Sequence, residues 1–149
     1  MKLDLEFSYS GLLKPAVDFG PGPLGVRLYA EVIGGVVEGK RLNGRVLTGG
    51  GDWLLMGQDG WGQVDVRVQF LTDDGVAIYS HYTGLLEFTP KAAEALGRGE
   101  GTDFADQYFR TTPRFECGDP RYAWLNQNLF VAEGRFIPGG VAYDVYRVT

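Results

Sequence analysis

Segments in which apolar and polar residues alternate, separated by turns that contain glycine, constrain the fold of this chain more than any other feature. From Val64 to Leu71, valines and a phenylalanine alternate with Asp, Arg and Gln, and this period of two is typical of a strand with one buried face. The Asp-Asp-Gly turn at residues 73–75 predicts a hairpin, because Asp-Gly tolerates the left-handed backbone that such turns require. Val76 to Thr83 is then the expected partner strand.

The composition of the 149 residues also favours β structure. Glycine accounts for 23 residues, and there are 9 Phe, 8 Tyr and 3 Trp, as expected for many tight turns between half-buried strands. One segment, Thr89 to Gly97, has the signals of a helix, with Thr89 as N-cap and Pro90 at the first helical position. No linker or repeat divides the chain, so residues 1–149 are expected to form a single domain.

About eight to ten short strands are predicted, and a closed antiparallel β-barrel is favoured over a sandwich. Several strands have mixed character on both faces, which suits a partly polar interior, and glycines within strands allow the bends that closure needs. Gly34-Gly35 predicts a kink or bulge, and the three glycines at 49–51 predict an unusual turn that orients Asp52 and Trp53. A barrel of this size has room for one small ligand.

The stretch from residue 108 to residue 136 carries most of the candidate site. We interpret it as a hairpin whose arms, residues 108–117 and 122–132, flank a turn at residues 118–120. Arg110 and Glu116 share one face of the first arm. One face of the second arm combines Tyr122, Trp124 and Asn126. Because polar groups gather here among large aromatic side chains, a ligand is predicted at this hairpin.

Three residues are candidates for catalysis, each with a structural alternative. Asp52 beside Trp53 resembles a carboxyl held against an aromatic wall, which suits proton transfer; alternatively it accepts hydrogen bonds from the glycine turn. Glu116 is a candidate general base with a pKa raised by burial, or else a carboxylate that accepts backbone N–H groups at the predicted turn. Arg110 is a candidate anchor for a carboxylate or enolate, or else an ion-pair partner of Asp65 or Asp52.

Six further residues complete the predicted ligand site. They are Trp53, Asp65, Tyr79, Tyr122, Trp124 and Asn126. The aromatic residues either line a cavity for a flat ligand or pack in the core. Asn126 either holds a carbonyl or a water molecule or caps the backbone of a neighbouring strand. If the face that carries Asp65 is the outer one, its carboxylate is a solvated charge.

Charge and motifs argue against several classes of function. A net charge of −5 without a basic cluster argues against nucleic acid as a partner. One histidine and one cysteine argue against a transition-metal site, and the sequence has no phosphate-binding loop or nucleophile elbow, so no metal and no cofactor are expected. Without a secretion signal, a long apolar run or a cysteine pair, the chain is expected to be cytoplasmic and not to enter a membrane.

Four phrases resemble a known family. They are FRTTPRFE at 109–116, YAWLN at 122–126, GGGDW at 49–53 and GGVVEG at 34–39. Together they resemble the bacterial and fungal UPF0311 family, also called DUF3237 (domain of unknown function 3237), from about Leu5 to Val148. The resemblance implies a closed barrel similar to lipocalin-like barrels, and often an oligomer, but no settled reaction. Cys117 stands where relatives tend to carry threonine, which argues against a catalytic cysteine shared by the family.

Two functions are predicted, with a third as a further alternative. The preferred one is a cofactor-independent isomerase, cyclase, lyase or hydrolase for a small cyclic or aromatic compound, with Asp52 or Glu116 as acid or base. Arg110 and Asn126 would stabilise negative charge in this enzyme. The second is a barrel that binds such a ligand without chemistry, and the third is a structural or oligomerisation module with a filled core.

Overall fold

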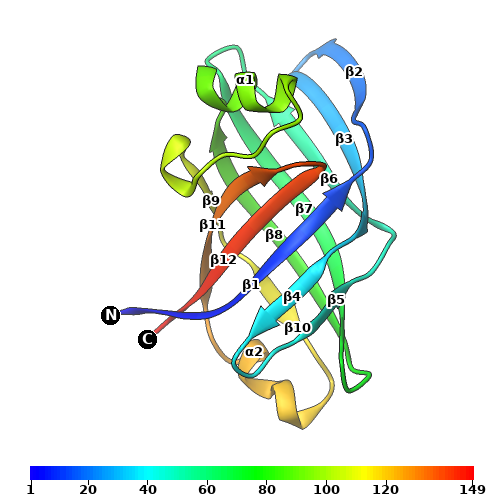
Figure 1. Ribbon diagram of the computed structural model, residues 1–149, viewed down its shortest axis with the longest axis vertical. Helices are drawn as coiled ribbons and strands as arrows, with labels where there is room; N and C mark the ends of the chain where they lie inside the picture. Colours follow the sequence, from blue (N-terminus) through cyan, green and yellow to red (C-terminus); the bar gives the residue numbers. More distant parts are fainter.

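The computed structural model describes all residues, 1–149, and consists almost entirely of antiparallel strands (Figure 1). The strands are β1 (Leu3–Leu13), β2 (Val17–Gly22), β3 (Gly25–Gly34), β4 (Val36–Gly39), β5 (Gly44–Val46), β6 (Gly50–Met56), β7 (Trp61–Thr72), β8 (Ala77–Glu87), β9 (Phe109–Thr111), β10 (Arg114–Glu116), β11 (Phe130–Ile137) and β12 (Gly140–Val148). The helical elements are α1 (Pro90–Gly97), α2 (Ala123–Asn126) and the 3-10 turns η1 (Phe104–Asp106) and η2 (Pro120–Tyr122). No helix combines the length and the apolar character that crossing a bilayer requires.

Strand pairing runs in a closed ring. From β8 the ring passes through β9, β11, β12 and β1, then divides into β3–β6 and β4–β5, and both branches join β7, which pairs with β8 again. If β3 with β4, β5 with β6, and β9 with β10 are each counted as one bent strand, eight positions surround the interior. The predicted all-β antiparallel barrel is confirmed, with β2 added at an edge outside the ring.

Glycine makes the bend between β3 and β4 possible. Gly35 has a φ of 146°, and a Cβ atom there would lie 1.8 Å from the carbonyl oxygen of Ser10. A side chain at this position would therefore push β1 away from the bent strand that it pairs with. The kink predicted at Gly34-Gly35 is confirmed.

Inward-facing aromatic and branched side chains fill much of the barrel. The core contains 23 buried hydrophobic residues, and β7 alternates as predicted, with its valines and Phe70 buried and the residues between them exposed. Phe7, Phe70 and Phe115 meet in this core with ring centroids 5.6–6.2 Å apart. Burial of these rings on one sheet face supplies the main driving force for closing the barrel.

Helices lie at both ends of the barrel (Figure 1). α1, at the upper end, follows the predicted signal: the Thr89 hydroxyl accepts the Ala92 N–H and donates to the Asp106 carbonyl. α2 lies at the lower end, where Leu125 is buried against the core. The helix predicted over residues 89–97 is therefore confirmed.

The predicted hairpin over residues 108–132 is wrong. Its first arm is divided into β9 and β10, and residues 120–126 form η2 and α2 instead of a returning strand. The cause is a helix-start signal, because the Asp119 side chain accepts the Arg121 N–H at 2.9 Å and Pro120 occupies the first helical position. This local capping outweighs the strand propensity of the aromatic residues that follow.

Candidate functional site

Asp52 lies on β6 and points into the barrel. Its cross-strand neighbours are Ala30 on β3 and Val66 on β7, and Val66 is buried in the core. Opposite residues of paired strands point to the same side of a sheet, so Asp52 shares the interior with Val66. The next residue, Trp53, points outward, where its ring lies 4.8 Å from that of Tyr29 and its exposed fraction is 43%.

Strand pairing between β6 and β7 is interrupted next to Asp52. Residues 51–52 pair with 66–67, and residues 55–56 pair with 62–63, but residues 53–54 of β6 and 64–65 of β7 do not pair with each other. The backbone N–H of Asp65 donates to the Asp52 carboxyl instead. The Trp53 carbonyl accepts from the Arg27 guanidinium at 3.1 Å. The hydrogen bond to the Asp52 carboxyl therefore comes from the backbone of β7 and not from the predicted glycine turn.

Burial gives the Asp52 carboxyl an unusual pKa. Loss of water raises this pKa to about 7; the hydrogen bond from the Asp65 backbone opposes the rise, and the Asp65 carboxylate adds to it. One carboxyl oxygen, Oδ1, is buried and has no hydrogen-bond partner. A carboxyl with this pKa is partly protonated at neutral pH, so it can both accept and donate a proton.

The Asp52 carboxylate acts electrostatically on three buried tyrosines. The rings of Tyr9 and Tyr143 stack with centroids 5.0 Å apart, and Tyr82 meets Tyr143 edge-on at 5.5 Å. The pKa of each is raised well above its usual value, mainly by burial and further by neighbouring hydroxyls and the Asp52 carboxylate. Val66 pairs with both Asp52 and Tyr82, so these residues form one row on the inner surface. Asp52, Tyr9, Tyr82 and Tyr143 are called the Asp52 cluster below.

The interior is partly open to solvent along β3 and β6. Leu28 and Leu54 face inward on the same side as Asp52, yet all three are half-buried, whereas the inward residues of β7 are buried. Two further hydroxyls, of Ser80 and Thr111, are buried without a hydrogen-bond partner. This part of the interior therefore combines apolar side chains with polar atoms that lack a hydrogen-bond partner.

Arg110 does not belong to this interior. Its guanidinium lies on the outer surface, 3.5 Å from the Glu133 carboxylate and 5.3 Å from the centre of the Tyr108 ring. The ion pair foreseen as its structural alternative exists, but with Glu133 instead of Asp65 or Asp52. The first arm of the predicted hairpin therefore turns its polar face to solvent.

Asp65 also lies on the outer surface. Its Oδ1 atom is 2.8 Å from Nε2 of His81, and the two side chains are 56% and 40% exposed. The structural alternative, a solvated charge on the outer face, describes this position. Asp65 acts on the interior through its backbone N–H and through the charge of its carboxylate, which affect the pKa of Asp52 in opposite directions.

Tyr79, Glu116 and Asn126 meet in an outer groove of about 660 Å³. Glu116 is exposed, so the burial on which its candidacy as general base depended is absent. The Asn126 side chain is occupied, because its Oδ1 accepts the Cys117 N–H and its Nδ2 donates to the Cys117 carbonyl, both at 2.8 Å. The backbone-capping alternative for Asn126 is thus the arrangement observed.

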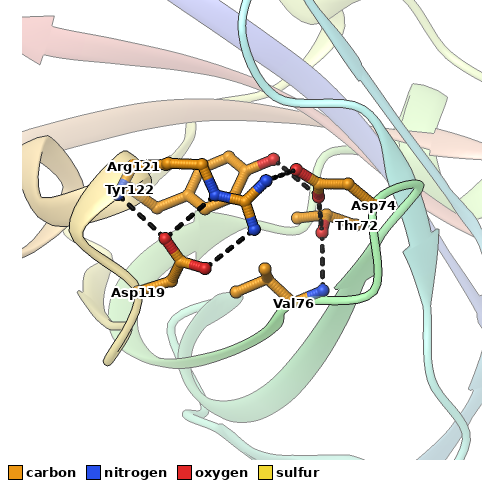
Figure 2. Close-up of polar contacts among 6 residues, drawn as sticks. All are labelled: Thr72, Asp74, Val76, Asp119, Arg121 and Tyr122. Carbon is orange, nitrogen blue, oxygen red and sulfur yellow. Dashed lines mark hydrogen bonds and ion pairs between the residues drawn. The ribbon is translucent and has the colours of Figure 1, made fainter.

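Tyr122 and Trp124 belong to the lower end of the barrel. The Tyr122 hydroxyl donates to Asp74 at 2.9 Å, and Arg121 bridges to the same carboxylate at 2.7 Å (Figure 2). The Arg41 guanidinium lies over the Trp124 ring, 3.7 Å from its centre. The lower latch, as this contact set is called below, consists of Thr72, Asp74, Asp119, Arg121 and Tyr122 (Figure 2). These contacts hold η2 and α2 against the barrel.

Of the predicted site residues, Asp52 alone belongs to the Asp52 cluster, and the sequence interpretation missed its three tyrosines. A usable signal was present, because Tyr9 and Tyr82 alternate in step with apolar residues of their strands. A tyrosine on a buried strand face needs a polar partner for its hydroxyl, so it points to polar groups inside the barrel. No group of three or more His, Cys, Asp or Glu side chains is arranged to hold a metal ion.

Known proteins resemble this chain both in sequence and in fold. The family described as "Protein of unknown function (DUF3237)" matches residues 1–148. A UPF0311 protein of Rhodopseudomonas palustris is 36% identical over 124 residues, which cover 83% of this chain and 81% of that protein. The crystal structure of a conserved protein of unknown function from the same organism superposes with a TM-score of 0.88 at 32% identity, covering 100% of this chain and 99% of that one.

Two other solved structures share the architecture. A β-barrel-like protein from Acinetobacter baumannii has a TM-score of 0.84 at 31% identity and covers 99% of this chain and 96% of its own. An enzyme from Penicillium herquei has a TM-score of 0.73 at 17% identity and covers 99% of this chain and 94% of its own. At that low identity the likeness to the fungal protein shows the fold alone.

Proposed function

This chain belongs to the DUF3237 (UPF0311) family, and we propose that it binds a small cyclic or aromatic molecule beside Asp52 and transfers a proton to or from it without a cofactor. The observation that carries the proposal is the inward-facing Asp52 carboxyl, with a pKa of about 7 and an unpartnered Oδ1 atom, in electrostatic contact with three buried tyrosines. Buried polar atoms without partners are rare in folded proteins, and perturbed carboxyls gather at active sites.

The proposed step is general acid–base catalysis by one carboxyl. Ionised Asp52 takes a proton from a C–H group next to a ligand carbonyl, and the electron pair of that bond moves toward the carbonyl oxygen as an enolate forms. Return of the proton from Asp52 to another ligand atom completes an isomerisation. Because the carboxyl pKa lies near neutrality, both protonation states needed for the cycle are populated.

The barrel architecture is compatible with this proposal. One protein with the same fold, from Penicillium herquei, is an enzyme. Half-buried apolar residues, among them Leu28 and Leu54, provide a low-dielectric wall in which a carboxyl and hydroxyl dipoles interact more strongly than in water. The preference for an enzyme therefore rests on the Asp52 cluster, and the fold does not oppose it.

A second candidate function is ligand binding without chemistry in the outer groove beside Tyr79. Its volume of about 660 Å³ lies within the range of small-molecule sites, roughly 300–1,000 Å³. Glu116 is solvated there and Asn126 is occupied by the backbone, so this groove offers a surface for binding and no group tuned for proton transfer. Substitution of Asp52 should remove ligand binding if the site is inside the barrel, and substitution of Tyr79 should remove it if the site is the outer groove.

Deuterium exchange into simple ketones tests the proposed proton transfer. The protein is incubated in D₂O with 1-tetralone or cyclohexanone, and deuterium next to the carbonyl is followed by NMR. We expect wild-type protein to accelerate exchange over buffer and Asp52→Asn to reduce that acceleration by about 100-fold. Asp73→Asn makes the same chemical change at an exposed position in the β7–β8 turn and should leave the rate unchanged.

A titration of the carboxyl itself provides a second readout that needs no ligand. In ¹³C NMR, the Asp52 carboxyl should titrate near pH 7, far from the ordinary aspartate value of about 4. An ordinary pKa for Asp52, or exchange as fast in Asp52→Asn as in wild type, contradicts its role as the acid–base group. Binding that Tyr79→Ala abolishes and Asp52→Asn leaves intact would favour the outer groove instead.

A further inference from the structure

The barrel interior holds a carboxyl without any compensating cation. The chain has 14 lysines and arginines and one histidine, and none of their side chains is buried. Arg110, the cation predicted to anchor an anionic ligand, is paired with Glu133 on the outer surface. Arg147, at the lower end of β12, is engaged by Glu6 at 2.7 Å. A ligand carboxylate beside Asp52 would therefore meet a second negative charge with nothing to offset it.

The groups on which the Asp52 carboxylate acts inside the barrel include three tyrosine hydroxyls, which are neutral hydrogen-bond donors. The hydroxyls of Tyr9 and Tyr143 are both within hydrogen-bonding reach of Tyr82, and Tyr82 shares a cross-strand row with Val66 and Asp52. Tyrosine hydroxyls donate to a carbonyl or phenol oxygen without adding charge, and they stabilise negative charge that develops on that oxygen during a reaction.

We infer that the Asp52 cluster selects uncharged ligands with a ketone or phenol oxygen, which accepts a hydrogen bond from Tyr82, and that it excludes carboxylates. This inference rests on the function proposed above and narrows its substrate class. Tyr82 is the assigned donor because it is the one tyrosine in the same cross-strand row as Asp52, with Val66 between them. The sequence had suggested an anionic ligand anchored by Arg110, and this inference assigns a neutral ligand instead.

A matched ligand pair tests the charge preference. 2-Naphthol and 2-naphthoate have the same ring system, but at about pH 8 the first is largely uncharged and the second is an anion. We expect the dissociation constant of wild-type protein, measured by NMR titration, to be at least about tenfold lower for 2-naphthol. In Asp52→Asn the difference between the two dissociation constants should shrink to about threefold or less through tighter naphthoate binding, whereas Asp73→Asn, at an exposed turn position, should behave as wild type.

The donor assignment is tested on the same strand. Tyr82→Phe should weaken 2-naphthol binding by about five- to tenfold, because it removes one hydrogen bond. Tyr79→Phe removes the same hydroxyl from the outer face of β8 and should leave binding unchanged. Near-UV circular dichroism establishes that each variant keeps its folded aromatic core before binding is compared.

Several outcomes overturn the inference. Naphthoate that binds wild type as tightly as 2-naphthol, an unchanged preference in Asp52→Asn, or no binding of either compound contradicts the assigned ligand class. If Tyr79→Phe weakens 2-naphthol binding and Tyr82→Phe does not, the ligand binds in the outer groove. The deuterium-exchange test judges the proposed function separately: exchange that depends on Asp52, together with no charge preference, refutes this inference alone.

Discussion

At the scale of single residues, Asp52 owes its chemistry to its surroundings. An aspartate exposed on a strand has a pKa near 4. On β6 the same side chain faces Val66 and three tyrosines, so its charge is poorly solvated and its pKa rises to about 7. Asp65, one strand away with its side chain outside, contacts His81 and remains a surface charge. The direction in which a side chain leaves the sheet thus decides whether an acid can act near neutral pH.

We expect Asp52→Asn to stabilise the protein at high pH and to have little effect in acid. The folded-state pKa of about 7 exceeds the unfolded value of about 4, so the folded protein holds an extra proton between these values. The stability gained from that proton is complete below about pH 4 and is lost as the pH rises through about 7. Because Asp52 is half-buried, we expect the variant's gain in unfolding free energy to be about 1–3 kcal/mol larger at pH 8 than at pH 4.5.

Urea unfolding at the two pH values measures this difference. Asp73→Asn, at an exposed position in the β7–β8 turn, serves as the matched control and should track the wild-type pH dependence closely. Stability curves that run parallel for wild type and Asp52→Asn across this range would show that the Asp52 carboxyl titrates with an ordinary pKa in the folded protein.

At the scale of elements, α2 depends on side-chain contacts with a distant turn. The helix has four residues, too few to be stable alone, and it follows η2 directly. Arg121 joins Asp119 at 2.8 Å to Asp74 in the β7–β8 turn at 2.7 Å (Figure 2). Asp74 also accepts from the Thr72 hydroxyl, and that hydroxyl accepts the Val76 N–H at 2.8 Å. The lower latch therefore couples a short helix to a hairpin nearly fifty residues away.

We expect Arg121→Gln to loosen η2 and α2 while the barrel stays folded. The Arg121 side chain is 58% exposed, so the loss should be local and visible as several-fold faster hydrogen exchange in residues 121–126, with β7 unchanged. Arg114→Gln, which alters an exposed arginine on neighbouring β10, is the control. Equal acceleration in the two variants would show that general surface charge, rather than the bridge, protects α2.

Acid should open the same contacts. Hydrogen bonds from Arg121 lower the pKa of Asp119 to about 2, and hydrogen bonds from Thr72 and Tyr122 lower the pKa of Asp74. Both pKa values lie below those of the unfolded chain, so the stabilisation is present above about pH 4 and is lost as the pH falls toward 2. The exchange rates of residues 121–126 should rise in that window.

At the scale of the whole molecule, the first and last strands close the barrel. β1 and β12 pair from Leu3–Val148 to Leu12–Gly140, and the two ends of the chain lie side by side in Figure 1. At a register shift between Leu5 and Phe7, the Glu6 carboxylate accepts from Arg147 at 2.7 Å and from Arg41 at 2.9 and 3.1 Å. Glu6 therefore connects the closing strands with the β4–β5 connection, and Arg41 in turn covers α2.

We expect Glu6→Gln to reduce the unfolding free energy by about 1–3 kcal/mol at pH 7, because two guanidinium groups lose their partner and the side chain is only 10% exposed. Burial raises the pKa of Glu6, but Arg41 and Arg147 outweigh it and lower the net value. This stabilisation is present above about pH 4 and is lost as the pH falls below that.

Thermal and urea unfolding at pH 7 and pH 3 measure the effect of Glu6. Glu38→Gln, at an exposed position on β4, is the control and should change stability by less than about 0.5 kcal/mol. If Glu6→Gln is as stable as Glu38→Gln at pH 7, the network does not contribute to closing the barrel.

Features that depend on neighbours along the chain follow from local sequence signals. The alternation of β7, the Asp-Gly turn that follows it, helix α1 and the bend at Gly35 are all present as predicted. Each is set by local backbone preferences, capping or period, and these act over a few residues. Residues 119–126 carried an equally local Asp-Pro signal, but their aromatic residues have strand propensity, and the sequence interpretation followed that propensity.

The tertiary structure alone decided which face of each strand is inside. Alternation defines two faces for a strand, but segments with polar and aromatic residues on both faces do not reveal which one the closed sheet encloses. Closure turned Arg110, Glu116, Tyr79 and Asp65 outward and brought Asp52 next to Tyr9, Tyr82 and Tyr143. These four cluster residues come from β6, β1, β8 and β12, so only the ring of strand pairings, and the burial that holds it closed, places their polar groups together.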